Sequence, residues 1–363
     1  MNRFPYQYDK FPETKIPGYD SHAFSGYSSI VTEIKRKIGN RSRAVVVLDF
    51  YPGVEEKEIL RGLSGLHYQA AFHADLCTYD TETYESMIRD NLTDDRVFGI
   101  LTTRKLSDYF IPEKVLELRS MIDRIESGII LVYGVGASLI TFGDLFVYCD
   151  LARWEIQKRY KKGMPNYKGK NTGDPQLAKY KRGFFVDWRL ADRHKKKYFD
   201  RFDYVLDTNE ADHPKMITGE AFVHALKVVA NQPFRLVPYF DPGVWGGQWM
   251  KEVCGLDRSK PNYAWSFDGV PEENSLYLRF GDIRVEIPAI DVVFYQPRAL
   301  LGERVHARFG DEFPIRFDLL DTMGGGNLSL QVHPLTEYIQ QTFGMHYTQD
   351  ESYYILDCAE SDA

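Results

Sequence analysis

Three residues near the carboxyl end of the chain have side chains that could hold a metal ion. Gln331 and His333 lie two residues apart in LSLQVHP, and Glu351 opens the run ESYYIL. Side chains two residues apart in a β-strand point to the same face, so a strand here would aim an amide oxygen and an imidazole into one pocket. With a carboxylate they form a ligand set that suits zinc or another first-row divalent ion. A packed or solvated pair without a metal would fit the same spacing.

The residues around this set resemble the zinc site of the class I (cupin-type) mannose-6-phosphate isomerases. That family carries FPxxxKxLDxxxxLSxQxHP and then GKTExWYIL, and this chain has FPIRFDLLDTMGGGNLSLQVHP at 313–334 and TQDESYYIL at 348–356. Upstream, YFDPGVWGGQWM at 239–250 is similar to the family's P-x-x-W-G-G opening, and YAWSFDGVPEENSL at 263–276 to its ExWEISA segment. The resemblance covers about 234–357.

The resemblance implies roles for five residues. Gln331, His333 and Glu351 would be three of four zinc ligands, and Ser329 would contact the phosphate of a sugar phosphate. Arg316 would stand where the family has the lysine of FPxxxK, although a guanidinium is not interchangeable with an ammonium group. The implied reaction is the interconversion of mannose 6-phosphate and fructose 6-phosphate.

Several positions depart from the family pattern. Gln349 replaces the lysine of GKTE, so the catalytic acid or base stays unknown, and Tyr263 replaces the glutamate of ExWEISA. The family's fourth ligand is a histidine near a later P-A-G-T-x-H motif, followed by a catalytic arginine, and the chain stops at Ala363 before either. We therefore expect either an amino-terminal piece of a longer protein or a vestigial site. His346 could replace the missing ligand or be a surface histidine.

Composition and charge are typical of a soluble globular protein. The chain has 363 residues, of which 44% are hydrophobic and 27% charged, and its formal net charge of −7 argues against nucleic acid as a partner. The four cysteines form no CxxC pair, which favours reduced thiols and a cytoplasmic location. No signal peptide and no apolar run of about 18 residues is present, so we expect no membrane partner. The oligomeric state is left open.

The first two thirds of the chain alternate between predicted strands and helices. RAVVVLDFYPG at 43–53 is a continuous apolar run, which indicates a strand buried on both faces of a parallel sheet. A helix is predicted at 54–65, and strands follow at 128–140 and 143–151. This alternation predicts a doubly wound α/β domain.

The strand, turn and helix at 43–65 have the layout of a phosphate-binding loop without its residues. Such a loop needs GxxxxGK[ST], but this one has one glycine, Glu55 and Glu56, and a Lys57 that does not follow a glycine. A nucleotide site here is therefore disfavoured.

A second resemblance nevertheless links this part of the chain to P-loop kinases. GIILVYGVGASLI at 128–140 and the stretch after it are similar to uridine-kinase-type enzymes, with Tyr133 in place of an acidic residue. We expect a P-loop-kinase-like domain that has lost phosphotransfer. If the domain had kept phosphotransfer, Asp75, Arg153 and Arg159 would be its candidate functional residues.

The segment 158–201 is strongly basic, with KRYKKG, KYKRG and RHKKK. A solvated lid or loop is the favoured interpretation, and a surface for a phosphorylated or acidic partner is the alternative.

Short alternating runs at 275–280, 283–289 and 291–297 then predict antiparallel strands of a partial cupin or jelly-roll β domain. The predicted division is 1–39 for an arm and helix, 40–232 for the kinase-like domain and 233–363 for the cupin domain.

Two functional hypotheses follow. The first is a zinc-dependent aldose–ketose isomerase-like protein acting on a sugar phosphate. The second is a non-catalytic binding or regulatory protein that senses a sugar phosphate or a nucleotide with a degenerate kinase domain.

Overall fold

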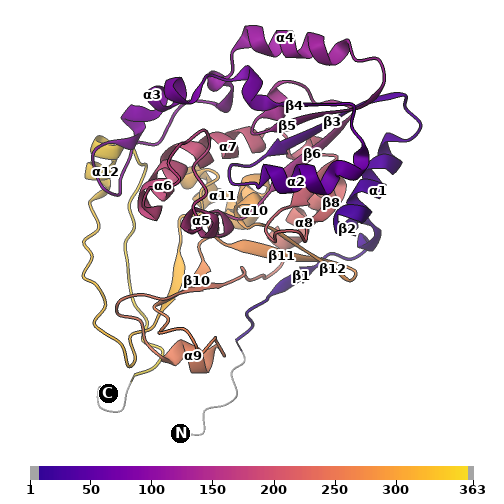
Figure 1. The fold of residues 1–363 in the computed structure, drawn as a ribbon. Coiled ribbons are helices and arrows are strands. Elements are labelled where there is room, and N and C mark those ends of the chain that lie inside the picture. The colour runs from indigo at the N-terminus through magenta and orange to yellow at the C-terminus, as the bar shows by residue number, and fades with distance from the viewer. Residues whose placement is uncertain (1–7, 359–363) are drawn as a thin grey trace.

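The computed structural model describes residues 8–358, and its largest element is a seven-stranded mixed sheet (Figure 1). The strand order is β2-β8-β7-β6-β3-β5-β4. The strands are β2 (Ala23–Ser25), β3 (Arg43–Phe50), β4 (Ala70–His73), β5 (Gly128–Gly134), β6 (Leu145–Asp150), β7 (Tyr204–Asp207) and β8 (Lys215–Thr218). The five strands from β4 to β7 are parallel, whereas β8 pairs antiparallel with both of its neighbours, β7 and β2.

The central strand β3 forms where the continuous apolar run predicted it. It pairs with β5 on one side and β6 on the other, and Val46, Val47 and Leu48 are completely buried. The predicted buried strands at 128–140 and 143–151 are confirmed as β5 and β6. Side chains on both faces of this strand are covered by the rest of the protein, which explains why its residues do not alternate between apolar and polar.

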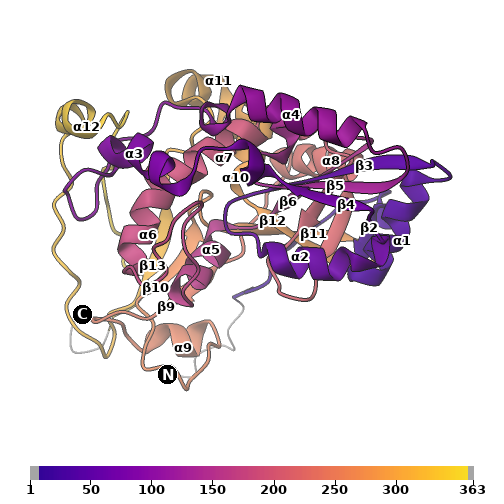
Figure 2. The same ribbon diagram turned by 45° about the horizontal axis from the view of Figure 1, so that its top comes forward.

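Helices cover both faces of this sheet. Figure 2 shows α4 on one side of β3, β4 and β5, and α2 on the other. The helices of this part are α1 (Tyr27–Ile38), α2 (Glu56–Gly62), α3 (Thr81–Leu92), α4 (Pro112–Asp123), α5 (Arg153–Lys161), α6 (Gln176–Arg182), α7 (Trp188–Lys195) and α8 (Gly219–Ala230). Helix α1 buries Ile30, Ile34 and Ile38, which lie at the i, i+4, i+8 positions of one helical face.

Helices α6 and α7 are joined by a π-helical turn, Gly183–Asp187. A π-helical turn holds one more residue than an α-helical turn and is often found at functional sites. Here it directs Phe184 toward a groove and buries Asp187.

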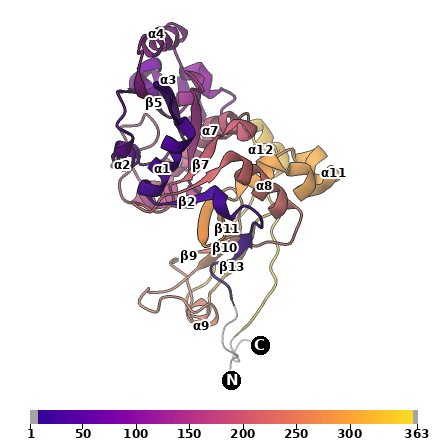
Figure 3. The same cartoon turned by 90° about the vertical axis from the view of Figure 1, so that its right-hand side faces the viewer.

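The carboxyl-terminal part adds two three-stranded sheets. The first has the order β1-β11-β12, and the second has the order β13-β10-β9 with antiparallel pairing. Their strands are β1 (Glu13–Lys15), β9 (Tyr239–Asp241), β10 (Trp265–Gly269), β11 (Ser275–Phe280), β12 (Ile283–Pro288) and β13 (Phe317–Leu320). The helices are α9 (Trp249–Val253), α10 (Ile290–Tyr295), α11 (Pro297–Phe309) and α12 (Thr336–Phe343). Figure 3 shows α9 and its neighbouring strands at the end of the molecule opposite α4.

The predicted strands at 275–280 and 283–289 are confirmed as β11 and β12, but the strand predicted at 291–297 is wrong. That stretch begins within helix α10, which buries Asp291, Val292 and Val293. The run is short and rich in β-branched residues, and such a run cannot be told from a buried helix by its period alone.

The strand expected to aim Gln331 and His333 into one pocket does not form, and the run that Glu351 opens is not a strand either. Residues 328–335 contain no strand, and neither do residues 351–356 (Figure 1). Leu330 and Val332 are 92% and 87% exposed, so neither has the packing partners that a half-buried strand requires. The described part of this region is thus a three-stranded antiparallel sheet with an extended tail.

One hydrophobic core serves both parts of the chain. Residues of β11 and β12, including Leu278, Phe280 and Val285, pack in the same cluster as β3 and α8. A second, small cluster forms around Met250, Cys254 and Tyr263. Among residues 8–358, no helix combines the length and the apolar character needed to cross a bilayer.

Candidate functional site

A groove of about 2300 Å³ lies between the α/β layer and the carboxyl-terminal segment 313–357. Tyr180 of α6, Phe184 of the π-helical turn and Arg189 of α7 line one side. All five residues with a predicted site role line the groove: Arg316, Ser329, Gln331, His333 and Glu351. The structure therefore places all five along one groove without the predicted strands, but brings only His333 and Glu351 into direct contact.

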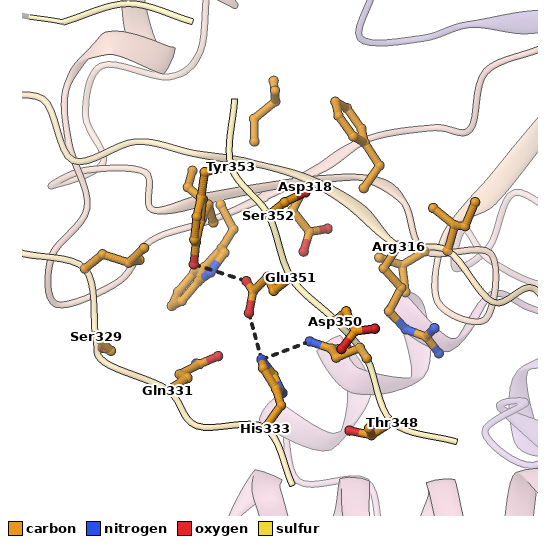
Figure 4. Close-up of a pocket in the computed structure, with 18 of the residues that line it drawn as sticks. Arg316, Asp318, Ser329, Gln331, His333, Thr348, Asp350, Glu351, Ser352 and Tyr353 are labelled. Atoms are coloured by element: carbon orange, nitrogen blue, oxygen red, sulfur yellow. Dashed lines mark hydrogen bonds and ion pairs between the residues drawn. The ribbon is translucent and has the colours of Figure 1, made fainter. Parts of the chain in front are cut away.

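His333 and Glu351 are in direct contact (Figure 4). His333 Nε2 lies 2.7 Å from Glu351 Oε2, and the Tyr353 hydroxyl donates to Glu351 Oε1 at 3.2 Å. Gln349 Nε2 lies 3.4 Å from the same imidazole nitrogen, so Gln349 also contacts the predicted ligand. Figure 4 shows Gln331 beside His333 on the same extended segment.

His333, Glu351 and Gln331 could supply three of the four ligands that a tetrahedral divalent ion needs. Two ligands of a tetrahedral zinc ion lie roughly 3.3 Å apart, given metal–ligand bonds of about 2.0–2.2 Å, so His333 and Glu351 would need to separate by about half an ångström. Gln331 would supply an amide oxygen. Within residues 8–358 no three His, Cys, Asp or Glu side chains cluster closely enough to hold a metal, so His346 does not join the pair.

Arg316 and Ser329, the predicted phosphate contacts, lie apart in Figure 4. Ser329 is exposed, on the same segment as Gln331. Arg316 Nη2 donates to Glu272 Oε1 at 2.9 Å, so its charge is already paired with a carboxylate. In FPxxxK the lysine comes four residues after the proline. Because the proline is Pro314 here, the lysine position is Asp318 and not Arg316, which corrects that assignment.

Asp318 is a site residue that the sequence reasoning missed. It lies on β13 opposite Phe267 of β10, which in turn pairs with Tyr239 of β9, so the three side chains share one face of the sheet. Burial raises the pKa of Asp318 to about 6; Arg316 opposes this shift, and the nearby carboxylates, including that of Glu351, add to it. An acid with a pKa near neutrality can accept and return protons at physiological pH.

A row of aromatic rings forms the same face of this sheet. Tyr239 stacks on Phe267 with 4.5 Å between ring centroids, and Phe267 lies 6.2 Å from Trp265. Trp154 of α5 extends the row by stacking on Tyr239 at 3.6 Å. Trp265 lines the groove, so an aromatic surface lies within reach of a ligand there.

The turn between β3 and α2, the possible nucleotide loop, is filled by side chains of the protein itself. Gly53 has a φ of +111°, and a Cβ at this position would lie 2.8 Å from Ile156 Cγ1. Arg159 donates to the Gly53 carbonyl at 2.8 Å and to the Thr208 carbonyl at 2.6 Å. Glu56 binds His73, with 2.9 Å between Oε2 and Nε2, and Lys57 is exposed.

The loop after β5, which also contains glycines, is likewise filled by a side chain of the protein, the carboxylate of Asp49. Asp49 at the end of β3 accepts hydrogen bonds from the backbone N–H groups of Gly136 and Ser138 and from the Ser138 hydroxyl. His194 Nε2 lies 2.9 Å from the same carboxylate. The glycine-containing turn 134–136 therefore binds an anion of the protein's own.

The basic segment 158–201 is not a solvated loop, which corrects the favoured interpretation. Five basic side chains of this segment and Arg153 just before it are at most 8% exposed: Arg153, Arg159, Lys179, Lys181, Arg182 and Lys195. Arg153 pairs with Asp192, and Lys195 pairs with both Asp150 and Asp291. Asp75 is more exposed, and its carboxylate lies 3.4 Å from Lys168 Nζ.

The described residues form a mixed α/β protein in which a large mixed sheet is accompanied by two smaller sheets, beside a groove lined by both polar and apolar side chains. The chain belongs to the family described as a domain of unknown function, DUF8485, whose match spans residues 26–231, more than half of the chain. A solved structure from Silicibacter sp. TM1040, provisionally described as a fructose transport system kinase, is similar to 46% of this chain and 91% of its own, with 12% identity and a TM-score of 0.32. The search of curated proteins gave no match.

Proposed function

We propose that this chain is a zinc-dependent aldose–ketose isomerase-like protein, with mannose 6-phosphate and fructose 6-phosphate as the substrate pair that the resemblance implies. The observation that carries the proposal is the contact between His333 and Glu351, 2.7 Å apart although 18 residues separate them in the sequence. Gln331 lines the same groove and would supply a third donor.

The proposed chemistry is a proton transfer between C1 and C2 of the sugar. A zinc ion held by Gln331, His333 and Glu351 would polarise the substrate oxygens as a Lewis acid. Asp318 takes the proton from one carbon and returns it to the other, because its pKa of about 6 leaves it mostly ionised at pH 7 yet able to be protonated. Asp318 thereby fills the role that Gln349 cannot, since an amide does not titrate.

We also propose a P-loop-kinase-like ancestry for the α/β layer and a cupin ancestry for the sheet β13-β10-β9. The parallel strands and the strand, turn and helix at 43–62 support the first. The order of motifs along 239–356 supports the second. Buried, unpaired Cys77, Cys149 and Cys254 suit the cytoplasmic location that we propose.

The alternative is a non-catalytic protein that binds a sugar phosphate or a nucleotide. Gln349 at the lysine position favours it, since a binding site does not require a proton-transfer group there. The filled turn at Gly53 argues against nucleotide as the ligand and against an active kinase, because Ile156 and Arg159 occupy the space around the loop.

The test combines metal content with turnover. Purified protein should contain about one zinc per chain, measured by plasma emission spectroscopy, and should interconvert an aldose and its ketose, assayed first as fructose 6-phosphate formed from mannose 6-phosphate in a coupled assay. The variant His333→Ala should lose both properties. His213→Ala is the matched control, because His213 is exposed on a turn outside the groove.

Zinc bound equally well by His333→Ala would overturn the assigned ligand set. Zinc binding without turnover of any aldose or ketose would overturn the isomerase and leave the binding protein.

A further inference from the structure

The charges that line the groove are predominantly negative. Its lining residues include eight carboxylates and three guanidinium groups, and no lysine. The carboxylates come from both sides, from Glu272 and Glu312 to Asp350 and Glu351. A divalent cation bound at His333 and Glu351 would still leave an excess of negative charge.

Two of the three guanidinium groups are already paired with carboxylates. Arg316 binds Glu272 at 2.9 Å, and Arg189 lies 3.7 Å from Glu312. The third, Arg308, lies over the ring of Phe309 with 5.3 Å to the centroid. A phosphate ester entering the groove would have to compete with Glu272 or Glu312 for its cation.

The carboxylates themselves respond to this negative potential. The pKa of Asp318 is raised by burial and further by Asp268, Glu351 and Glu273. Glu272 Oε2 is shielded from solvent and has no hydrogen-bond partner among the described residues, so it is an unsatisfied acceptor that a small rotation of this groove-lining side chain would offer to a ligand. A hydroxyl group can donate such a bond, whereas a phosphate dianion cannot.

Trp265 offers an apolar surface next to these acceptors. The apolar face of a pyranose ring can pack against an indole, while its hydroxyls donate to the surrounding carboxylates. The groove thus offers more hydrogen-bond-accepting carboxylates than cationic donors, and an indole ring beside them. This combination suits a neutral ligand with several hydroxyl groups.

We infer that the groove takes an uncharged aldose or ketose rather than its phosphate ester. The inference rests on the proposed function for the reaction and differs from it in the substrate. The phosphate ester carries an additional charge of about −1.5 to −2 at pH 7, which the lining carboxylates repel.

The test compares the binding of mannose and mannose 6-phosphate to the full chain by isothermal titration calorimetry at pH 7.5. At low ionic strength mannose should bind about tenfold more tightly, because net like charges at about 10 Å repel across a water-filled groove. Raising the salt to about 0.3 M should strengthen binding of the phosphate and leave that of mannose unchanged.

A charge variant makes the test specific to the groove. Glu312→Gln removes one lining carboxylate and frees Arg189, so the affinity for mannose 6-phosphate should rise about threefold or more while that for mannose stays the same. Glu126→Gln is the matched control, because Glu126 is exposed beyond α4 and outside the groove.

The possible failures can be told apart. Tighter binding of mannose 6-phosphate at both ionic strengths would overturn the uncharged substrate and leave the isomerase proposal intact. Failure of both sugars to bind or turn over would overturn both.

Discussion

Replacing Lys195 by methionine should be among the most damaging single substitutions in this chain. Lys195 is 1% exposed, and its ammonium group lies 2.8 Å from Asp150 Oδ2 and 2.5 Å from Asp291 Oδ1. Asp150 ends a strand of the large sheet, and Asp291 belongs to α10 of the carboxyl-terminal part. The substitution keeps a side chain of similar length and removes only the charge that these two carboxylates share.

The magnitude follows from the burial of both partners. Breaking a buried ion pair by removing one member costs roughly 3–5 kcal/mol, because the remaining charge stays buried without compensation. Burial raises the pKa of Asp291, Lys195 opposes this shift and Asp150 adds to it, so removing Lys195 raises that pKa further. A carboxyl with a raised folded-state pKa loses stability as pH rises, and the variant should therefore lose more stability at pH 8 than at pH 5.

The assay is urea denaturation of Lys195→Met at these two pH values. Lys196→Met is the matched control, because the adjacent lysine is 28% exposed and pairs with a partly exposed Asp311, and such pairs contribute up to about 1 kcal/mol. A loss below about 1 kcal/mol for Lys195→Met at pH 8 would refute the argument.

Three further predictions concern the rest of the fold. Burial and then Asp207 raise the pKa of Glu286 to about 7, so stability should fall between pH 5 and 8 by up to about 3 kcal/mol, and Glu286→Gln should remove that fall in urea titrations. Gly53→Ala should lower stability by about 1–3 kcal/mol, because φ is positive and Ile156 blocks the Cβ; an unchanged melting temperature would contradict this. Leu330→Asp should change stability by less than about 0.5 kcal/mol, and a larger loss would show that a partner covers this side chain.

The sequence was sufficient to predict the elements that are determined locally or by continuous burial. The apolar run of β3 and the spacing of Ile30, Ile34 and Ile38 each had one simple interpretation. A two-residue spacing and the resemblance to the isomerases also singled out His333 and Glu351, which the structure brings into contact; their role as metal ligands stays a prediction.

The remaining features depend on contacts between distant residues. β-propensity at 328–335 does not make a strand without a neighbouring strand to accept its hydrogen bonds. Lys195 resembles any surface lysine in the sequence, and its partners Asp150 and Asp291 lie 45 and 96 positions away. Asp318 gains its raised pKa from the sheet and groove around it, which no local pattern encodes.

The π-helical turn Gly183–Asp187 sets the rotational phase of α7 relative to α6. Each residue advances a helix by about 100°, so deleting one residue from this turn would rotate α7 by that angle about its axis. His194 would then turn away from Asp49, and Lys195 from Asp150. The number of residues between Arg182 and Trp188 is therefore constrained in addition to their identities, and single-residue deletions should be tolerated less well here than point substitutions.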